Sequence, residues 1–105
     1  NRVGKTYTGC LIDAIHATGD YPDDYDGHRF EHPPLIWVLG YSGEKIRDLL
    51  QKPLVGSVSN GTAEGGLIPK ERIVDVLPML GTPRCSREIR VRHKNGGIAR
   101  IQFWS

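Results

Sequence analysis

The chain has 105 residues, a net charge of +2 and 38% hydrophobic residues. This profile fits one domain and excludes collagen-like, low-complexity and coiled-coil proteins. The longest apolar run, Leu35 to Leu39, is far too short to cross a bilayer, so we expect no membrane partner. Residues 1–80 hold 8 Lys/Arg against 11 Asp/Glu, net −3, whereas residues 81–105 hold 6 against 1, net +5. The basic C-terminal quarter is therefore the strongest functional hint.

The first residue is Asn1 and not Met. We therefore expect residues 1–105 to be a single domain taken from a longer protein, and the absence of a signal peptide leaves its compartment unknown. An intracellular location, nuclear or cytoplasmic, is favoured. Two cysteines, Cys10 and Cys85, are too few for a disulfide-built miniprotein and either pair once or remain two buried thiols.

The N-terminal part contains two expected strands separated by a loop. Val3 to Ile15 has a strand-like composition, and residues 19–34 form a long loop with an acidic, tyrosine-rich segment. Leu35 to Leu39 is a continuous apolar run bounded by prolines and Gly40. This pattern predicts a strand that is buried on both faces.

One convincing helix follows this strand. Ser42 is placed to cap it, Ile46, Leu49 and Leu50 share one helical face, and Pro53 is expected to end it.

Shorter elements follow the helix. Residues 54–59 and 66–68 are expected to be strands flanking a Gly/Asn turn, and residues 69–80 a helical turn that leads into a strand.

The C-terminus predicts a β-hairpin from residues 87–93 and 98–104. A three-residue loop at 95–97 pairs Val91 with Ile101 and Ile89 with Phe103, which matches apolar with apolar positions. The opposite face then holds opposed pairs: Arg90 and Gln102, Arg92 and Arg100, and Glu88 and Trp104.

These elements predict a mainly β fold, with α+β as the alternative. We expect a compact small β-barrel or a strongly bent antiparallel sheet, with one or two short helices. A barrel would remove the exposed edges that many short strands otherwise present.

The arginine-rich face of the hairpin predicts a non-catalytic module that binds DNA or RNA. Guanidinium groups match phosphate geometry, and an exposed indole can stack on a base. The expected binding residues are Arg90, Arg92, Lys94, Arg100 and Trp104. The alternative is that these arginines form a solvated face or pair with the acidic loop.

A metal-independent, toxin-like ribonuclease is the main enzymatic alternative, although we lean against an enzyme. Such enzymes use histidines as acid and base and a cation to stabilise the developing charge. The candidates are His28, His93 and Arg92. No nucleophile elbow, phosphate-binding glycine loop or dinucleotide fingerprint is evident, and no cofactor is expected.

The acidic, aromatic loop offers a third function, recognition of methylated basic peptides through an aromatic cage. The candidate residues are Tyr21, Asp23, Asp24, Tyr25, Trp37 and Tyr41. We expect no metal site. The Asp24–Gly27 segment lacks the downstream glutamate of a calcium loop, and Cys10, Cys85 and the two histidines His28 and His32 lack zinc-ribbon spacing.

Two short segments resemble DNA-binding families. Residues 17–26 resemble a stretch of SET-and-RING-associated domains, which read modified DNA. Tyr7-Thr8-Gly9, the turn at 22–26 and residues 38–41 are similar in order to HIRAN domains, small barrels that bind DNA ends. The remaining motifs of both families are replaced here, so no family is assigned.

Overall fold

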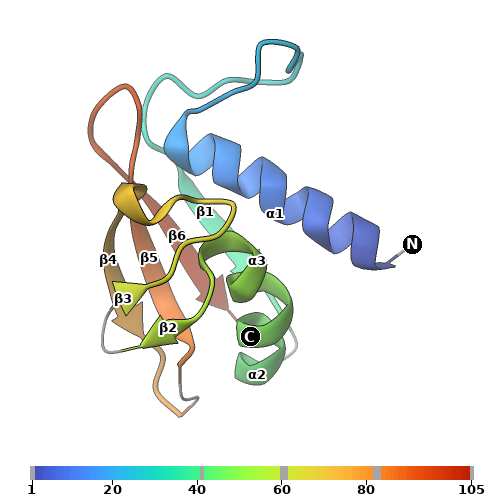
Figure 1. Cartoon of the computed structure of the whole chain (residues 1–105), viewed down its shortest axis with the longest axis vertical. Helices are drawn as coiled ribbons and strands as arrows, with labels where there is room; N and C mark the ends of the chain where they lie inside the picture. The colour runs from blue at the N-terminus through green and yellow to red at the C-terminus, as the bar shows by residue number, and fades with distance from the viewer. Residues whose placement is uncertain (1, 41, 60–61, 82–83, 105) are drawn as a thin grey trace.

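A computed structural model describes residues 2–40, 42–59, 62–81 and 84–104. It shows one face of a four-stranded mixed sheet covered by helices, an α+β arrangement (Figure 1). Tyr41 lies outside the described residues, as do residues 60–61 at the expected Gly/Asn turn. Within the described part of the chain, no helix is long and apolar enough to span a membrane.

The helical elements are α1, α2, a π-helical segment η1, α3 and a short 3₁₀ helix η2. They span Arg2–Thr18, Gly43–Lys45, Ile46–Gln51, Lys52–Val55 and Lys70–Arg72. Strands β1, β4, β5 and β6 form the main sheet, and β2 pairs with β3 in a small separate ladder. The strands β1 to β6 span Leu35–Leu39, Val58–Ser59, Thr62–Ala63, Ile73–Pro78, Ser86–Arg92 and Ile98–Trp104.

Helix α1 contradicts the strand predicted for residues 3–15. Its buried side chains, Cys10, Ala14 and Ala17, recur at helical spacing and present a narrow face to the sheet. The prediction failed because it followed the large apolar residues, and two of these, Leu11 and Ile12, are 42% and 40% exposed. Small residues make the contact because they let the helix approach the sheet closely.

The second helical segment begins as predicted and ends later than predicted. The Ser42 hydroxyl accepts a hydrogen bond from the Lys45 amide at 3.2 Å, which confirms the cap. Pro53 does not end the segment, because η1 widens into a π-helix before it and Pro53 enters the first turn of α3. The segment ends at Gly56, whose φ of 77° lies in the left-handed region.

The main sheet has the order β1-β6-β5-β4, with β1 parallel to β6 and the other pairs antiparallel. Strand β1 was predicted correctly in position but not in burial. Val38 is buried, whereas Trp37 and Leu39 are 65% and 73% exposed. The strand lies at the edge of the described sheet with helices on one face only, so its alternate side chains point to solvent.

Among the other predictions for the middle of the chain, some are confirmed and others are wrong. The helical turn leading into a strand is confirmed by η2 and β4, and the loop at 19–34 contains no regular element. Of residues 54–59, expected to be a strand, only 58–59 form one, and 54–55 are helical in α3. Residues 66–68, also expected to be a strand, do not form one.

The C-terminal hairpin has the predicted strands and faces but a register shifted by two residues. Ile89 pairs with Ile101 and Val91 with Ala99, so the opposed arginines are Arg90 and Arg100. The connection spans residues 93–97, and the His93 amide bonds the Gly97 carbonyl at 3.1 Å. A shift of two preserves which side chains share a face, so the apolar pattern alone could not select this register.

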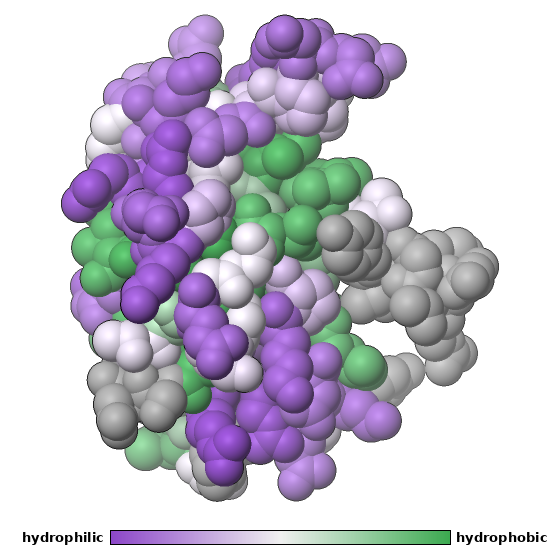
Figure 2. Space-filling model, viewed as in Figure 1, coloured by the Kyte–Doolittle hydropathy of each residue, from purple (hydrophilic) through white to green (hydrophobic). Residues whose placement is uncertain are grey.

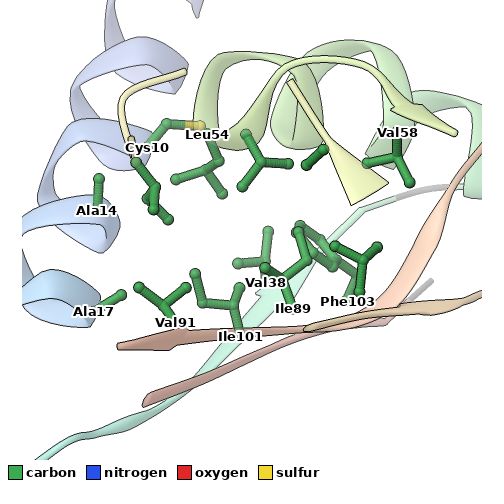
Figure 3. Close-up of a cluster of buried hydrophobic side chains, with 14 of the residues drawn as sticks. Cys10, Ala14, Ala17, Val38, Leu54, Val58, Ile89, Val91, Ile101 and Phe103 are labelled. Carbon is green, nitrogen blue, oxygen red and sulfur yellow. The ribbon is translucent and has the colours of Figure 1, made fainter. Parts of the chain in front are cut away.

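The core lies between the sheet and the helices (Figure 3). Val38, Ile89, Val91, Ile101 and Phe103 project from the sheet towards α1 and α3. The helices and the β2–β3 ladder lie on this same side. The other face of the sheet, called the outer face below, therefore has no covering layer of helices among the described residues.

This architecture corrects the predicted fold class. The sheet is neither closed into a barrel nor strongly curled, and the α+β alternative is the one observed. Parallel pairing of β1 with β6 also contradicts an all-antiparallel sheet. The barrel prediction failed because it counted residues 3–15, which lie in α1, as a strand.

Candidate functional site

The outer face carries two exposed tryptophans. Trp37 on β1 and Trp104 on β6 are 65% and 51% exposed, and their rings meet edge to face with centroids 6.2 Å apart. The Trp37 indole N–H donates to the Gln102 amide oxygen at 3.1 Å across the strand pair. The hydrogen bond orients one ring, and both rings keep open faces that an aromatic or planar ligand can contact.

A buried carboxylate joins the two arginines of this face. Glu88 accepts hydrogen bonds from Arg90 Nε at 2.7 Å, Arg100 Nη2 at 2.9 Å and Gln102 Nε2 at 2.8 Å. The hydrogen bond from Arg100, assisted by those from Gln102 and Arg90 and opposed by burial, lowers the pKa of Glu88 to about 2. The opposed cations are thus bridged by one anion, which relieves their repulsion and reduces the positive field of the face.

The other predicted nucleic-acid residues lie at the loop end of the hairpin. Arg92 and Lys94 are exposed, and neither side chain has a hydrogen bond or ion pair to any described residue. Trp104 lies at the opposite end of β6, roughly 20 Å away for a seven-residue strand. The five residues predicted to bind nucleic acid therefore all lie on the hairpin, but they are spread along its full length.

In the acidic, aromatic loop, the aromatic rings already contact a cation of the same loop, Arg29. Tyr21 and Tyr25 stack with centroids 5.3 Å apart, and the Arg29 guanidinium lies 5.7 and 6.0 Å from these rings. Arg29 Nη2 also donates to the carbonyls of Pro22, Asp23 and Tyr25. Asp23 and Asp24 are exposed, and Trp37 lies on β1, so the predicted cage residues belong to two different elements.

The candidate histidines occupy different environments. His93 is 1% exposed, its Nδ1 accepts the Asn95 amide hydrogen at 3.2 Å, and burial lowers its pKa. Its ring lies so close to Gly19 that a Cβ there would come within 2.7 Å of it. His28 is exposed in the loop at 19–34, with its ring 4.5 Å from that of Phe30.

The residues weighed as metal ligands are not assembled in the described part of the chain. No group of three or more His, Cys, Asp or Glu side chains there could hold a metal ion. Cys10 and Cys85 are free and buried. Cys10 Sγ donates to the Leu50 carbonyl at 3.6 Å, and burial raises its pKa to about 11, so it is a protonated thiol inside the fold.

The start of α1 carries a motif that the predicted strand concealed. Gly4-Lys5-Thr6 falls within the first five residues of this 17-residue helix. These residues match the last three positions of the phosphate-binding loop G-x-x-x-x-G-K-[ST], which opens a helix. The first glycine of that pattern would fall two positions before Asn1. The tripeptide Gly-Lys-Thr followed by small residues at helical spacing, Cys10, Ala14 and Ala17, was the signal available in the sequence.

Comparison with known proteins connects the chain to a terminase. It is similar to the terminase large subunit of Salmonella phage P22, with 29% identity over 106 aligned residues. The alignment covers 89% of this chain and 21% of that protein, so the chain spans about a fifth of the length of this curated relative. No family model and no solved structure matches the chain.

Proposed function

We propose that the first turn of α1 binds the phosphates of a nucleoside triphosphate. The observation that carries this proposal is Gly4-Lys5-Thr6 at the start of a long helix that packs on the sheet. Backbone N–H groups at a helix N-terminus attract anions. In the loop motif the lysine contacts the β- and γ-phosphates and the Thr hydroxyl binds the Mg²⁺ of the nucleotide. By this motif, Lys5 and Thr6 are the residues that we propose for these roles.

The arrangement of elements supports the same proposal. In such proteins a strand precedes the loop, and the helix after it crosses the sheet to a parallel strand. Here α1 packs on the same sheet as β1, the strand that follows it in the chain. The similarity to a terminase large subunit supports including DNA as a partner in this proposal.

Nucleotide affinity of the full natural polypeptide tests this site. Lys5→Ala is expected to weaken Mg-ATP binding by at least about tenfold, because a charge-assisted hydrogen bond to phosphate is lost. Thr6→Ser keeps the hydroxyl and should bind normally, whereas Thr6→Val should not bind the Mg-nucleotide well. Lys45→Ala on α2 is the charge-matched control. Unchanged affinity in Lys5→Ala, measured by calorimetric titration, would overturn the proposal.

Nucleic-acid binding through the outer face is the second proposed function. The observation that favours it is the combination of two exposed tryptophans with Arg92 and Lys94, two cations without a partner among the described residues. The tryptophans would stack on bases, and the cations would contact phosphates. Arg90 and Arg100 contribute less, because Glu88 already binds both.

The sharpest test of this second function spares the Glu88 cluster. Replacing Arg90 and Arg100 would strand a buried carboxylate, so a loss of binding would not be distinguishable from misfolding. Arg92→Ala with Trp104→Ala is expected to weaken binding of single-stranded DNA by more than about tenfold and to reduce its salt dependence. Lys70→Ala, an exposed cation on η2, is the control. Equal affinities of the double variant and the control would contradict this function.

A further inference from the structure

Three cations surround a cavity of about 380 Å³ on the helical side of the sheet. Arg47, Lys52 and Arg84 line it together with Asp48, Gln51, Ser57 and Val58. Asp48 already accepts a hydrogen bond from Arg47 at 3.0 Å. Lys52 and Arg84 are exposed, and their side chains have no hydrogen bond or ion pair to any described residue. The positive charge of this cavity is therefore only partly compensated by the protein.

The π-helical segment η1 brings two of these cations together. The Lys52 amide bonds the Arg47 carbonyl, a step of five residues. In a regular α-helix, side chains five residues apart diverge by about 140°. The wider turn of a π-helix reduces this angle and directs both side chains towards one side. Such segments are rare and frequently accompany functional sites.

A buried glutamine contacts the backbone of the third cation, Arg84. Gln51 is 1% exposed, and its side chain donates to the Arg84 carbonyl at 2.8 Å and accepts from the Ser86 amide at 2.7 Å. Arg84 has a φ of 58°, the only positive φ among the described residues other than glycine. That conformation costs an arginine about 1 kcal/mol. The clamp from Gln51 holds this strained backbone, from which the Arg84 side chain starts at the edge of the cavity.

From this geometry we propose that the cavity, called the Arg84 pocket, binds a phosphate group of a nucleic-acid backbone. Lys52 and Arg84, which have no hydrogen bond or ion pair within the described part of the chain, and the Ser57 hydroxyl offer the donors that a phosphate oxyanion takes. The cavity is larger than a lone phosphate requires, which leaves room for the flanking sugars. The Arg84 pocket is built by η1, α3, β2 and the turn before β5, and so differs from both the start of α1 and the outer face. Figure 2 shows strongly hydrophilic surface in the lower part of the view, near α2 and β2.

The experiment compares Lys52→Ala/Arg84→Gly with wild type and with Lys70→Ala, in the full natural polypeptide. Glycine at position 84 removes the guanidinium and accepts the positive φ, so the variant should remain folded, as thermal melting verifies. Duplex DNA affinity is expected to fall about tenfold, and the slope of log affinity against log salt should decrease by about 1. Inorganic phosphate should shift the amide resonances around Lys52 and Arg84 in wild type only. Mg-ATP binding, which depends on Lys5, should not change.

Three results would overturn the proposal. One is unchanged DNA affinity in the double variant, even if inorganic phosphate still shifts those resonances, since the pocket would then take free phosphate only. Another is the same loss of affinity in Lys70→Ala, which would indicate a diffuse charge effect. The third is a loss of Mg-ATP binding in the double variant at unchanged DNA affinity, which would assign the cations to the nucleotide.

Discussion

At the scale of single residues, the negative charge of Glu88 is what stabilises the outer face. It is 2% exposed and accepts hydrogen bonds from three side chains. Glu88→Ala is expected to destabilise the fold by about 3 kcal/mol, because it leaves Arg90 and Arg100 opposed without their anion. Urea unfolding at pH 7 measures this loss. Arg87→Ala, which removes an exposed cation of the same strand, should change stability by less than about 0.5 kcal/mol.

In contrast to Glu88, ionised Asp13 on α1 lowers the stability of the fold. Burial raises its pKa from 3.8 to about 6. Between these pH values the folded state binds more protons than the unfolded state, so this residue lowers stability as the pH rises through that window. Asp13→Asn should therefore stabilise the protein at pH 8 and lose this advantage at pH 3.5, as measured by urea unfolding at both values. A stabilisation of equal size at both would contradict the assignment, and Asp24→Asn in the exposed loop is the control.

At the scale of elements, the limits of sequence-based prediction are visible in α1 and the hairpin. The hairpin strands were predictable because apolar and polar residues alternate along them. Helix α1 was not, because Ala14 and Ala17 contribute contact by being small, and small residues carry little hydrophobic signal.

The functional residues divide in the same way. For Arg92 and Trp104, only their exposure on a shared face was predictable, since strand parity survives an error in register, and their role in binding stays a prediction. The Arg84 pocket was not predictable, because it depends on a π-turn and on a hydrogen bond between Gln51 and a residue 33 positions away. Neither the widened turn nor that long-range contact has a local pattern.

Two glycines of the N-terminal region give a matched test of helix α1 and its end. Gly9 lies inside the helix, and a Cβ there would meet nothing within 4 Å, so Gly9→Ala should stabilise by up to about 1 kcal/mol. Gly19, just after the helix, has a φ of 75° and abuts His93. Gly19→Ala should destabilise by more than about 1 kcal/mol. Melting temperatures should move in opposite directions, and a shift in the same direction would contradict the described end of α1.

At the scale of the whole molecule, the proposed activities lie on separate surfaces. The helices and the β2–β3 ladder cover one side of the sheet, and the Arg84 pocket opens there between η1, α3 and β2. The outer face carries the tryptophans, the Glu88 cluster and, at the end of β5, Arg92. The near-neutral net charge of +2 therefore conceals distinct basic regions. A nucleotide and a nucleic acid could be bound at once without competing for the same residues.

The placement of the two tryptophans also makes the protein its own optical probe. The chain has two tryptophans in total, and neither lies in the core. Unfolding in urea should therefore shift the emission wavelength only slightly while the helical circular dichroism is lost. Iodide should readily quench the tryptophan emission of the native protein. A large red shift of this emission on unfolding would show that another surface shields the two rings. Because both rings lie on the outer face, tryptophan emission should change when a ligand binds there and should not change when a ligand binds at α1.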